Sequence, residues 1–122
     1  MTSPNIASLV TIVGFTSYIG LTTTSPTVLL SNPESSNSIY KINYINVSNG
    51  HGGSAVNITM GYHTAAAGAG TSIRLASTIS VPANSSLILL DKPLYLEENR
   101  SLVVTSNPAY PTDIICSYEK IS

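Results

Sequence analysis

Short apolar runs separated by turn residues are the strongest pattern in this sequence. Within residues 81–105 the turns are supplied by Pro82-Ala-Asn84, by Pro93 and by Glu97-Glu-Asn-Arg100. The runs between them are Leu87–Leu90, Leu94–Leu96 and Leu102–Val104. Runs of this length with such punctuation are typical of extended strands joined by compact turns. This region therefore predicts three short β-strands.

Two further strands are predicted in the middle of the chain. Apolar residues occupy every second position over residues 56–62, after a glycine-rich turn at 49–54. A second alternating stretch covers residues 73–81, and it predicts that Ile73, Leu75, Ile79 and Val81 point inward. The small residues 64–71 between them offer nothing to pack, so we expect a hairpin with a long flexible tip.

The stretch 39–48 reads as a strand whose alternation changes phase. Ile42 and Tyr44 share one face, whereas Ile45 and Val47 fall on the other. Either both faces of this strand are covered, or a β-bulge resets the alternation near Tyr44.

The last strand is predicted over residues 113–121, with Ile114, Cys116 and Tyr118 inward. Apolar residues do not recur at helical spacing over three turns, so we expect essentially no α-helix. About eight or nine strands must close into two packed sheets or a barrel. The predicted fold class is an all-β antiparallel β-sandwich, of jelly-roll or immunoglobulin-like topology.

Residues 1–33 form an uncharged N-terminal segment, followed by a sandwich core at 34–122 within one domain overall. Strands are plausible at about 8–19 and 27–30. They are either ordinary strands of the sandwich or an extended arm that contacts a neighbouring subunit. The candidate partner contacts are Ile6, Leu9, Val10, Ile12, Val13, Phe15, Tyr18, Ile19 and Leu21.

The composition of the chain excludes several classes of partner. Charged residues make up 9% of the chain, and the formal net charge is -1. The basic residues are scattered, which argues against a nucleic-acid partner. No apolar run approaches the roughly 20 residues of a membrane span, and no positively charged leader opens the chain, so we expect neither a membrane partner nor secretion. So few charges favour a protein whose faces are covered by partners, including copies of itself.

Candidate chemistry is sparse. The sequence contains none of the common nucleophile, phosphate-loop or zinc motifs, and we expect no enzyme, cofactor or metal site. Cys116 lies in an alternating strand and reads as a small buried hydrophobe rather than a catalytic thiol. Glu97-Glu98 reads as a surface turn rather than a pair of catalytic carboxylates.

Two residues on loops could contact a ligand. His51 stands in the glycine-rich turn, and Tyr110 is presented by Asn107-Pro-Ala-Tyr-Pro111. Tyrosines together with Ser, Asn and Gly are typical of recognition surfaces. An alternative function is therefore a glycan-binding module that uses Tyr110 and the loops at 50–54 and 65–70.

From about Ser38 to its end the chain resembles a family of small β-sandwich virion structural proteins of tailed bacteriophages, of the type met in phages of cyanobacteria and marine bacteria. The resemblance rests on Ile39-Tyr-Lys-Ile-Asn-Tyr-Ile-Asn-Val-Ser-Asn, Leu75-Ala-Ser-Thr-Ile-Ser-Val-Pro-Ala-Asn-Ser-Ser-Leu, Pro93-Leu-Tyr-Leu-Glu-Glu and Cys116-Ser-Tyr-Glu-Lys-Ile-Ser. The family's usual Gly-Asp turn after the acidic pair is Asn99-Arg100 here. Asn tolerates a left-handed backbone, so the turn is retained while the local charge reverses.

This resemblance implies a non-enzymatic virion protein, synthesised in the host cytoplasm. We expect a capsid decoration or cement protein that stabilises the assembled shell through neutral and apolar contacts. Its partners would be the major capsid protein or other virion proteins, and a homo-oligomer, such as a trimer, is expected. A neck or tail accessory protein is the alternative within the same particle.

Overall fold

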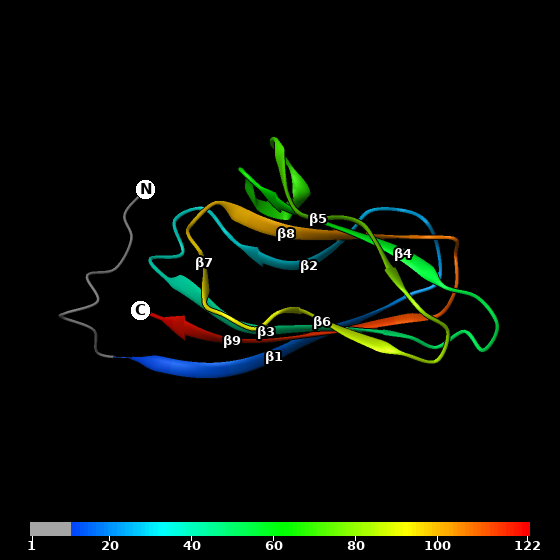
Figure 1. Ribbon diagram of the computed structural model, residues 1–122. Coiled ribbons are helices and arrows are strands. Elements are labelled where there is room, and N and C mark those ends of the chain that lie inside the picture. The colour runs from blue at the N-terminus through cyan, green and yellow to red at the C-terminus, as the bar shows by residue number, and fades with distance from the viewer. Residues whose placement is uncertain (1–10) are drawn as a thin grey trace.

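The computed structural model describes residues 11–122, which form two antiparallel β-sheets packed face to face (Figure 1). One sheet has five strands in the order β1-β9-β3-β6, with β7 also paired to β3, and the other has four in the order β2-β8-β4-β5. The strands are β1 (Ile12–Leu21), β2 (Thr27–Asn32), β3 (Ile39–Asn49), β4 (Val56–His63), β5 (Ser72–Val81), β6 (Ser86–Leu90), β7 (Leu94–Leu96), β8 (Arg100–Asn107) and β9 (Thr112–Ile121). The predicted all-β sandwich is confirmed.

The strand order decides between the two topologies that the sequence left open. β1 pairs with β9, β2 with β8, β3 with β6 and β4 with β5, as in one long hairpin whose paired segments alternate between the sheets. This wrapped arrangement is the jelly roll. It brings strands that are distant in sequence side by side, so each outer face of the sandwich is assembled from segments far apart along the chain.

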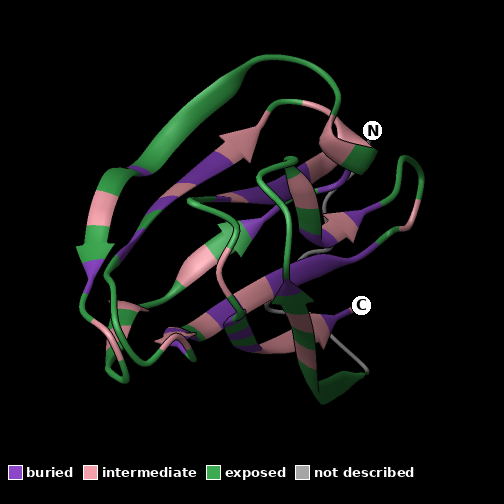
Figure 2. Cartoon of the chain, turned by 90° about the vertical axis from the view of Figure 1, so that its right-hand side faces the viewer, coloured by how far each residue is buried: buried purple, intermediate pink, exposed green. Residues whose placement is uncertain are grey.

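The core fills the space between the sheets. Side chains such as Ile42, Ile58, Leu102 and Ile114 are completely buried, and they come from strands of both sheets. Burial of this much branched apolar surface is the main favourable contribution to folding. In Figure 2 the inner strands are banded with buried positions, whereas the edge strand β5 is almost wholly exposed.

Two buried asparagines link the sheets at the ends of strands. The Nδ2 atom of Asn32, at the end of β2, donates to the Leu96 carbonyl oxygen of the opposite sheet at 3.0 Å. The Nδ2 atom of Asn49, at the end of β3, donates to the Val81 carbonyl oxygen at 3.0 Å. Amides satisfy backbone carbonyls that would otherwise lose their partners at the sheet ends.

The predicted phase change in β3 is a β-bulge. The register of β3 against β9 shifts between Ile42 and Tyr44. Ile42 and Ile45 are therefore both buried, while Tyr44 is exposed on the outer face.

The inward pattern predicted for β5 is wrong in its first half. The register against β4 shifts on either side of Met60, where Ala76 pairs with Met60. Ala76 is buried, whereas Ile73 and Leu75 are exposed at the edge of the sheet. A bulge moves the side chains that follow it to the other face, which simple alternation does not foresee.

Helical structure in the described residues is limited to a short 3₁₀ turn, Ala66–Gly68, labelled η2. Residues 12–21 and 27–32 of the uncharged N-terminal segment are strands of the two sheets. Over the range 11–122, no helix has the length and apolar character that crossing a membrane requires.

Candidate interaction surfaces

The candidate partner contacts of the N-terminal segment fall into three groups. Ile6, Leu9 and Val10 lie outside the described residues. Ile12, Val13, Phe15 and Tyr18 are exposed on the edge strand β1, and Tyr18 is 76% exposed. Ile19 is partly buried against the core and Leu21 is buried in it. The exposed members are therefore available to a partner, and Leu21 is not.

Tyr18 belongs to an apolar row that crosses the outer face of the five-stranded sheet. It stands directly opposite Ile115 on β9, which stands opposite Asn46 on β3, which stands opposite Ile88 on β6. Ile114 and Cys116 are buried, so Ile115 must point outward. Ile115 is 45% exposed and Ile88 is 54% exposed. We call Tyr18, Ile115, Asn46 and Ile88 the apolar row.

One row of side chains borders the apolar row on each side. The neighbouring row toward one end of the strands consists of Gly20, Asp113, Ser48 and Ser86, and the row toward the other end contains Thr16, Ser117 and Tyr44. Successive rows on one face are about 7 Å apart along the strands. The apolar row is therefore a ridge with short side chains beside it in the row of Gly20, whereas on its other side Tyr44 is also exposed, by 36%.

The sequence did not single out Ile115 or Ile88. A signal was nevertheless present, because Ile114-Ile115 and Leu87-Ile88-Leu89 place apolar residues at consecutive positions of a strand. Consecutive residues point to opposite faces, so one member of each run had to face outward.

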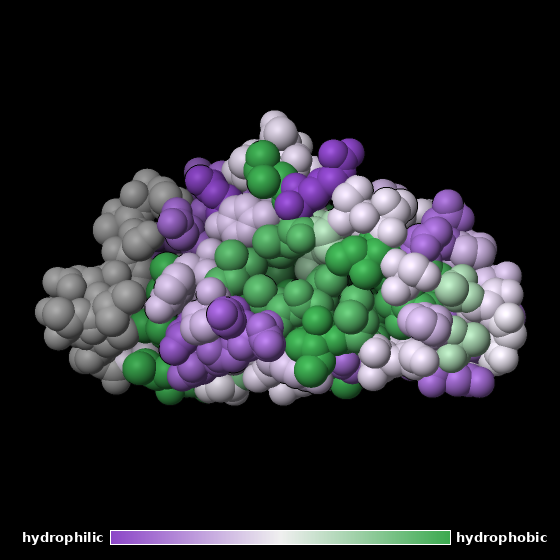
Figure 3. Space-filling view, in the orientation of Figure 1, coloured by the Kyte–Doolittle hydropathy of each residue, from purple (hydrophilic) through white to green (hydrophobic). Residues whose placement is uncertain are grey.

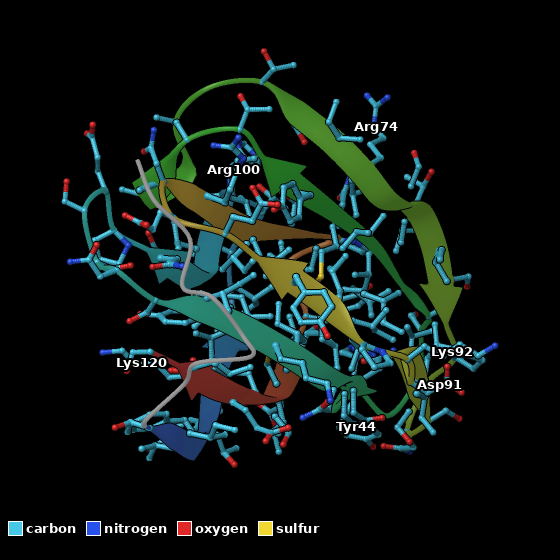
Figure 4. All side chains as sticks on the ribbon, turned by 90° about the vertical axis from the view of Figure 1, so that its left-hand side faces the viewer. Tyr44, Arg74, Asp91, Lys92, Arg100 and Lys120 are labelled. Carbon is cyan, nitrogen blue, oxygen red and sulfur yellow. The ribbon has the colours of Figure 1, made fainter. Side chains whose placement is uncertain are left out.

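Two opposite charges on this outer face stand side by side. Lys41 on β3 lies opposite Glu119 on β9 in the register of the sheet. The Asn43 amide also donates to Glu119 Oε1 at 3.1 Å. The other basic side chains project from well-separated places in Figure 4, which labels Arg74, Lys92, Arg100 and Lys120. The arrangement gives no positive stripe of the kind that a phosphate backbone needs.

On the inner face, the same sheet carries three aromatic rings in contact. Phe15 stacks on Tyr118 with ring centroids 5.6 Å apart, and Tyr40 lies 5.2 Å from Tyr118. Burial raises the pKa of Tyr40 and of Tyr118 above the usual value of a tyrosine. These three rings stabilise the fold by packing on one another. Phe15, the outermost ring, is partly exposed at the edge of the sheet.

The outer face of the four-stranded sheet is built differently, because the loop 64–71 folds over it. The backbone N–H of Ala66 donates to Asn99 Oδ1 at 3.0 Å, and that of Gly68 donates to Ser101 Oγ at 2.9 Å. Ser101 Oγ in turn donates to the Ala65 carbonyl oxygen at 2.7 Å. The loop predicted as a flexible tip with nothing to pack is instead fixed to β8 and its preceding turn.

Gly68 lies directly on an apolar pair of that face. Val28 on β2 and Val103 on β8 are cross-strand partners. A Cβ atom at Gly68 would stand 3.3 Å from a Val28 methyl and 3.4 Å from a Val103 methyl, and Gly68 has a φ of +76°. Only glycine combines this left-handed backbone with so close an approach. The loop thus covers Val103, which is 8% exposed.

Beside this loop the four-stranded sheet has a cavity of about 360 Å³. Its lining is mostly small or hydroxyl-bearing: Pro26, Thr59, Gly61, His63, Gly68, Ser72, Val103 and Thr105. The ring of His63 is engaged through Nδ1, which lies 3.2 Å from the Ala69 carbonyl oxygen. Around the loop, the outer face of this sheet is therefore covered or polar, and of the apolar pair only Val28 stays partly open, at 37% exposed.

The two predicted loop contacts come together in space. The rings of His51 and Tyr110 stack with centroids 3.9 Å apart. His51 Nδ1 accepts hydrogen bonds from the backbone N–H groups of Gly53 and Ser54, at 3.1 and 3.0 Å. These hydrogen bonds fix the turn, and the stacked His51 ring occupies one face of Tyr110. Tyr110 therefore offers a ligand a smaller platform than a free ring would.

The acidic turn also differs from its prediction. Glu97 is exposed, but Glu98 is 1% exposed, because it continues the inward alternation from the buried Leu96. Neither carboxylate oxygen of Glu98 has a hydrogen-bond partner in the described structure. Asn99 adopts a φ of 57°, so it takes the left-handed conformation expected of it in the turn.

Reactive chemistry is limited in the described residues. Cys116 is free and buried, as predicted, and burial raises its pKa to about 12. A thiol with this pKa stays protonated at neutral pH and is a poor nucleophile. Within residues 11–122 no group of three His, Cys, Asp or Glu side chains is close enough to hold a metal ion.

Sequence comparisons identify no relative: no protein-family model matches the chain, and no curated protein matches it. Among solved structures, the chain is similar to one from the study "Bacillus endospore appendages form a novel family of disulfide-linked pili". The TM-score is 0.55 at 19% identity, over 98% of this chain and 96% of that chain. This likeness shows a shared fold.

Two viral chains are more distant. The "Cyanophage Pam1 capsid asymmetric unit" gives a TM-score of 0.42 at 8% identity, over 99% of this chain and 91% of that one. A chain of infectious bursal disease virus, Gx strain, gives 0.34 at 10% identity, over 91% of this chain and 38% of that one. Structural similarities this weak support no conclusion about this chain. The resemblance to phage virion proteins therefore stays a prediction from sequence.

Proposed function

We propose that this chain is a non-enzymatic structural subunit that assembles with copies of itself into an extended structure such as a surface appendage. The observation that carries the proposal is the apolar row left open on the five-stranded sheet. Three large apolar side chains exposed in one row across a sheet are typical of a protein–protein contact.

Further features support assembly. The chain is 9% charged, so little electrostatic repulsion opposes contact between copies. On the side seen in Figure 3, apolar side chains also reach the surface beside β6, the edge strand that ends the apolar row. The fold is shared with the chain from the endospore pili. Those pili are described as disulfide-linked, whereas this chain has one cysteine, and that cysteine is buried. Contacts between copies would therefore be non-covalent.

The test is the state of the purified full chain. We expect sedimentation velocity to show mass that grows with protein concentration, and negative-stain electron microscopy to show regular assemblies. Treatment with a reducing agent should leave them intact, because Cys116 is buried. A protein that stays monomeric up to about 1 mM, where even weak specific pairing is populated, would overturn the proposal.

The sequence resemblance to phage virion proteins favours a second candidate function, in which the chain is part of a viral particle. In that setting the chain would be a decoration protein of a viral shell, with the major capsid protein as its partner and the virion as its location. Binding to emptied phage shells in a co-sedimentation assay distinguishes the two. Saturation at hundreds of copies per particle supports shell decoration, a dozen copies supports a neck or tail position, and no binding leaves self-assembly alone.

A further inference from the structure

The two outer faces of the sandwich differ in whether another segment of the chain covers their apolar residues. On the four-stranded sheet the pair Val28 and Val103 is met by the chain's own loop through Gly68. On the five-stranded sheet Tyr18, Ile115 and Ile88 form a longer row, and in the described residues they remain exposed by 76%, 45% and 54%. No segment among residues 11–122 covers this second face, and it is available to another molecule.

We propose that the outer face of the five-stranded sheet docks on the same face of a second copy, with the apolar row of each copy lying beside the apolar row of the other. This inference rests on the proposed self-assembly and names the surface that carries it. We choose a second copy as the occupant for three reasons. The shape of this face suits a copy of itself, two such faces bury enough area for a specific contact, and their charges do not oppose it.

Shape is the first argument. The neighbouring row runs parallel to the apolar row and is made mostly of short side chains: Gly20, Asp113, Ser48 and Ser86. We call it the low row. A two-fold axis between these rows places the ridge of each copy over the low row of the other, as required for an isologous contact. Sheets packed in this way sit about 10 Å apart, the distance at which such side chains interdigitate.

Area is the second argument. Three strands about 33 Å long and the shorter β6, about 17 Å long, spaced about 4.8 Å apart, present roughly 600 Å². Two such faces bury about 1,200 Å² together, which reaches the lower end of the range for specific protein contacts. The contact is therefore strong enough to be specific and weak enough to depend on concentration.

Charge is the third argument. Lys41 and Glu119 are opposite each other within one copy, so they present little net charge to a second. Asp113 lies in the low row, at the strand that also carries Ile115. Apart from Asp113, the uncharged ridge meets hydroxyls and glycine. A highly charged partner such as a nucleic acid finds no complement on this surface.

The experiment uses the full chain and two variants in the apolar row, Ile115→Glu and Ile88→Glu. Each places a carboxylate where a second copy would bring its own carboxylate close. The matched control is Ile73→Glu on β5, because Ile73 is 58% exposed against 54% for Ile88 and lies on the other sheet. Circular dichroism checks that every variant remains folded, which is expected for exposed positions.

We expect sedimentation velocity to show that both row variants raise the dissociation constant at least about tenfold, while Ile73→Glu leaves it unchanged. Mixing Ile115→Glu with Ile115→Lys should restore association, because opposite charges then meet across the pair. Row variants that associate like the unaltered chain overturn this inference while the proposed function stands. Failure of the mixture to recover association also overturns it. A monomeric unaltered chain removes the proposed function itself.

Discussion

The outer face of the four-stranded sheet and the outer face of the five-stranded sheet show two ways of dealing with apolar residues that point away from a core. The first face has its own cover, the loop 64–71, held by hydrogen bonds to Asn99 and Ser101. The second has a ridge across four strands and no cover in the described structure. A covered apolar residue adds to the stability of one chain, whereas a bare one adds to the stability of an assembly.

Removing the cover should have the largest effect. Thr64 and Thr71 are joined by a backbone hydrogen bond, so an Asn-Gly turn replacing residues 65–70 closes the β4–β5 hairpin tightly. The change removes the loop's hydrogen bonds and uncovers Val28 and Val103. We expect the free energy of unfolding in urea to fall by about 3 kcal/mol, from lost hydrogen bonds and lost apolar burial. Light scattering should rise as well, since both outer faces are then apolar.

Gly68→Ala should disturb the cover without removing it. The added methyl group meets Val28 and Val103, and the left-handed backbone disfavours alanine. We expect a loss of about 1–2 kcal/mol in thermal or urea unfolding, together with faster proteolysis of the loop. Gly14→Ala on β1 is the control, because a Cβ atom there meets nothing within 4 Å. Equal losses at both glycines would contradict the difference between the faces.

Ser101→Ala removes the hydroxyl that accepts from Gly68 and donates to Ala65. Ser101 is fully buried under the loop, so we expect the free energy of unfolding to fall by about 1 kcal/mol. Ser86→Ala, at an exposed position of the bare face, should leave stability unchanged. A cost for Ser86→Ala as large as that for Ser101→Ala would show that the exposed face is stabilised within the single chain.

Ile115→Thr should have the smallest effect on the folded monomer. Its side chain contributes little to the core, so we expect a change within about 0.5 kcal/mol, measured at a concentration where the chain is monomeric. The adjacent Ile114→Thr is the positive control, because Ile114 is fully buried. If Ile115→Thr destabilises the monomer as strongly as Ile114→Thr, the apolar row belongs to the fold and not to an interface.

Much of the fold could be predicted because strands have a two-residue period. The alternation over 56–62 marked β4, and the phase change in 39–48 marked the bulge beside Tyr44. The apolar row could not be predicted, because residues 18, 46, 88 and 115 become neighbours only through the jelly-roll order and its register. Periodicity says which residues share a face of one strand, and it is silent on which strands lie side by side.

The loop and the acidic turn were missed for a related reason. Residues 65–70 have almost no side chains to reveal packing, and the loop is held by its backbone N–H groups, which bond to Ser31, Asn99 and Ser101 from more than 30 positions away. Backbone donors are the same in every residue, so composition does not disclose them. Glu98 is buried because strand geometry continues through the turn, against the usual preference of a carboxylate for water.

The pairing of the first described strand with the last has a mechanical consequence. Thr11 and Ser122 exchange two backbone hydrogen bonds, so both lie at the same end of the β1–β9 ladder. A force pulling these two residues apart would load one pair of bonds at a time and peel β1 away like a zip. A force that enters through a sheet face instead acts on many strands at once. A subunit of this kind resists tension best when its neighbours bind the outer faces of its sheets rather than the ends of its β1–β9 pair.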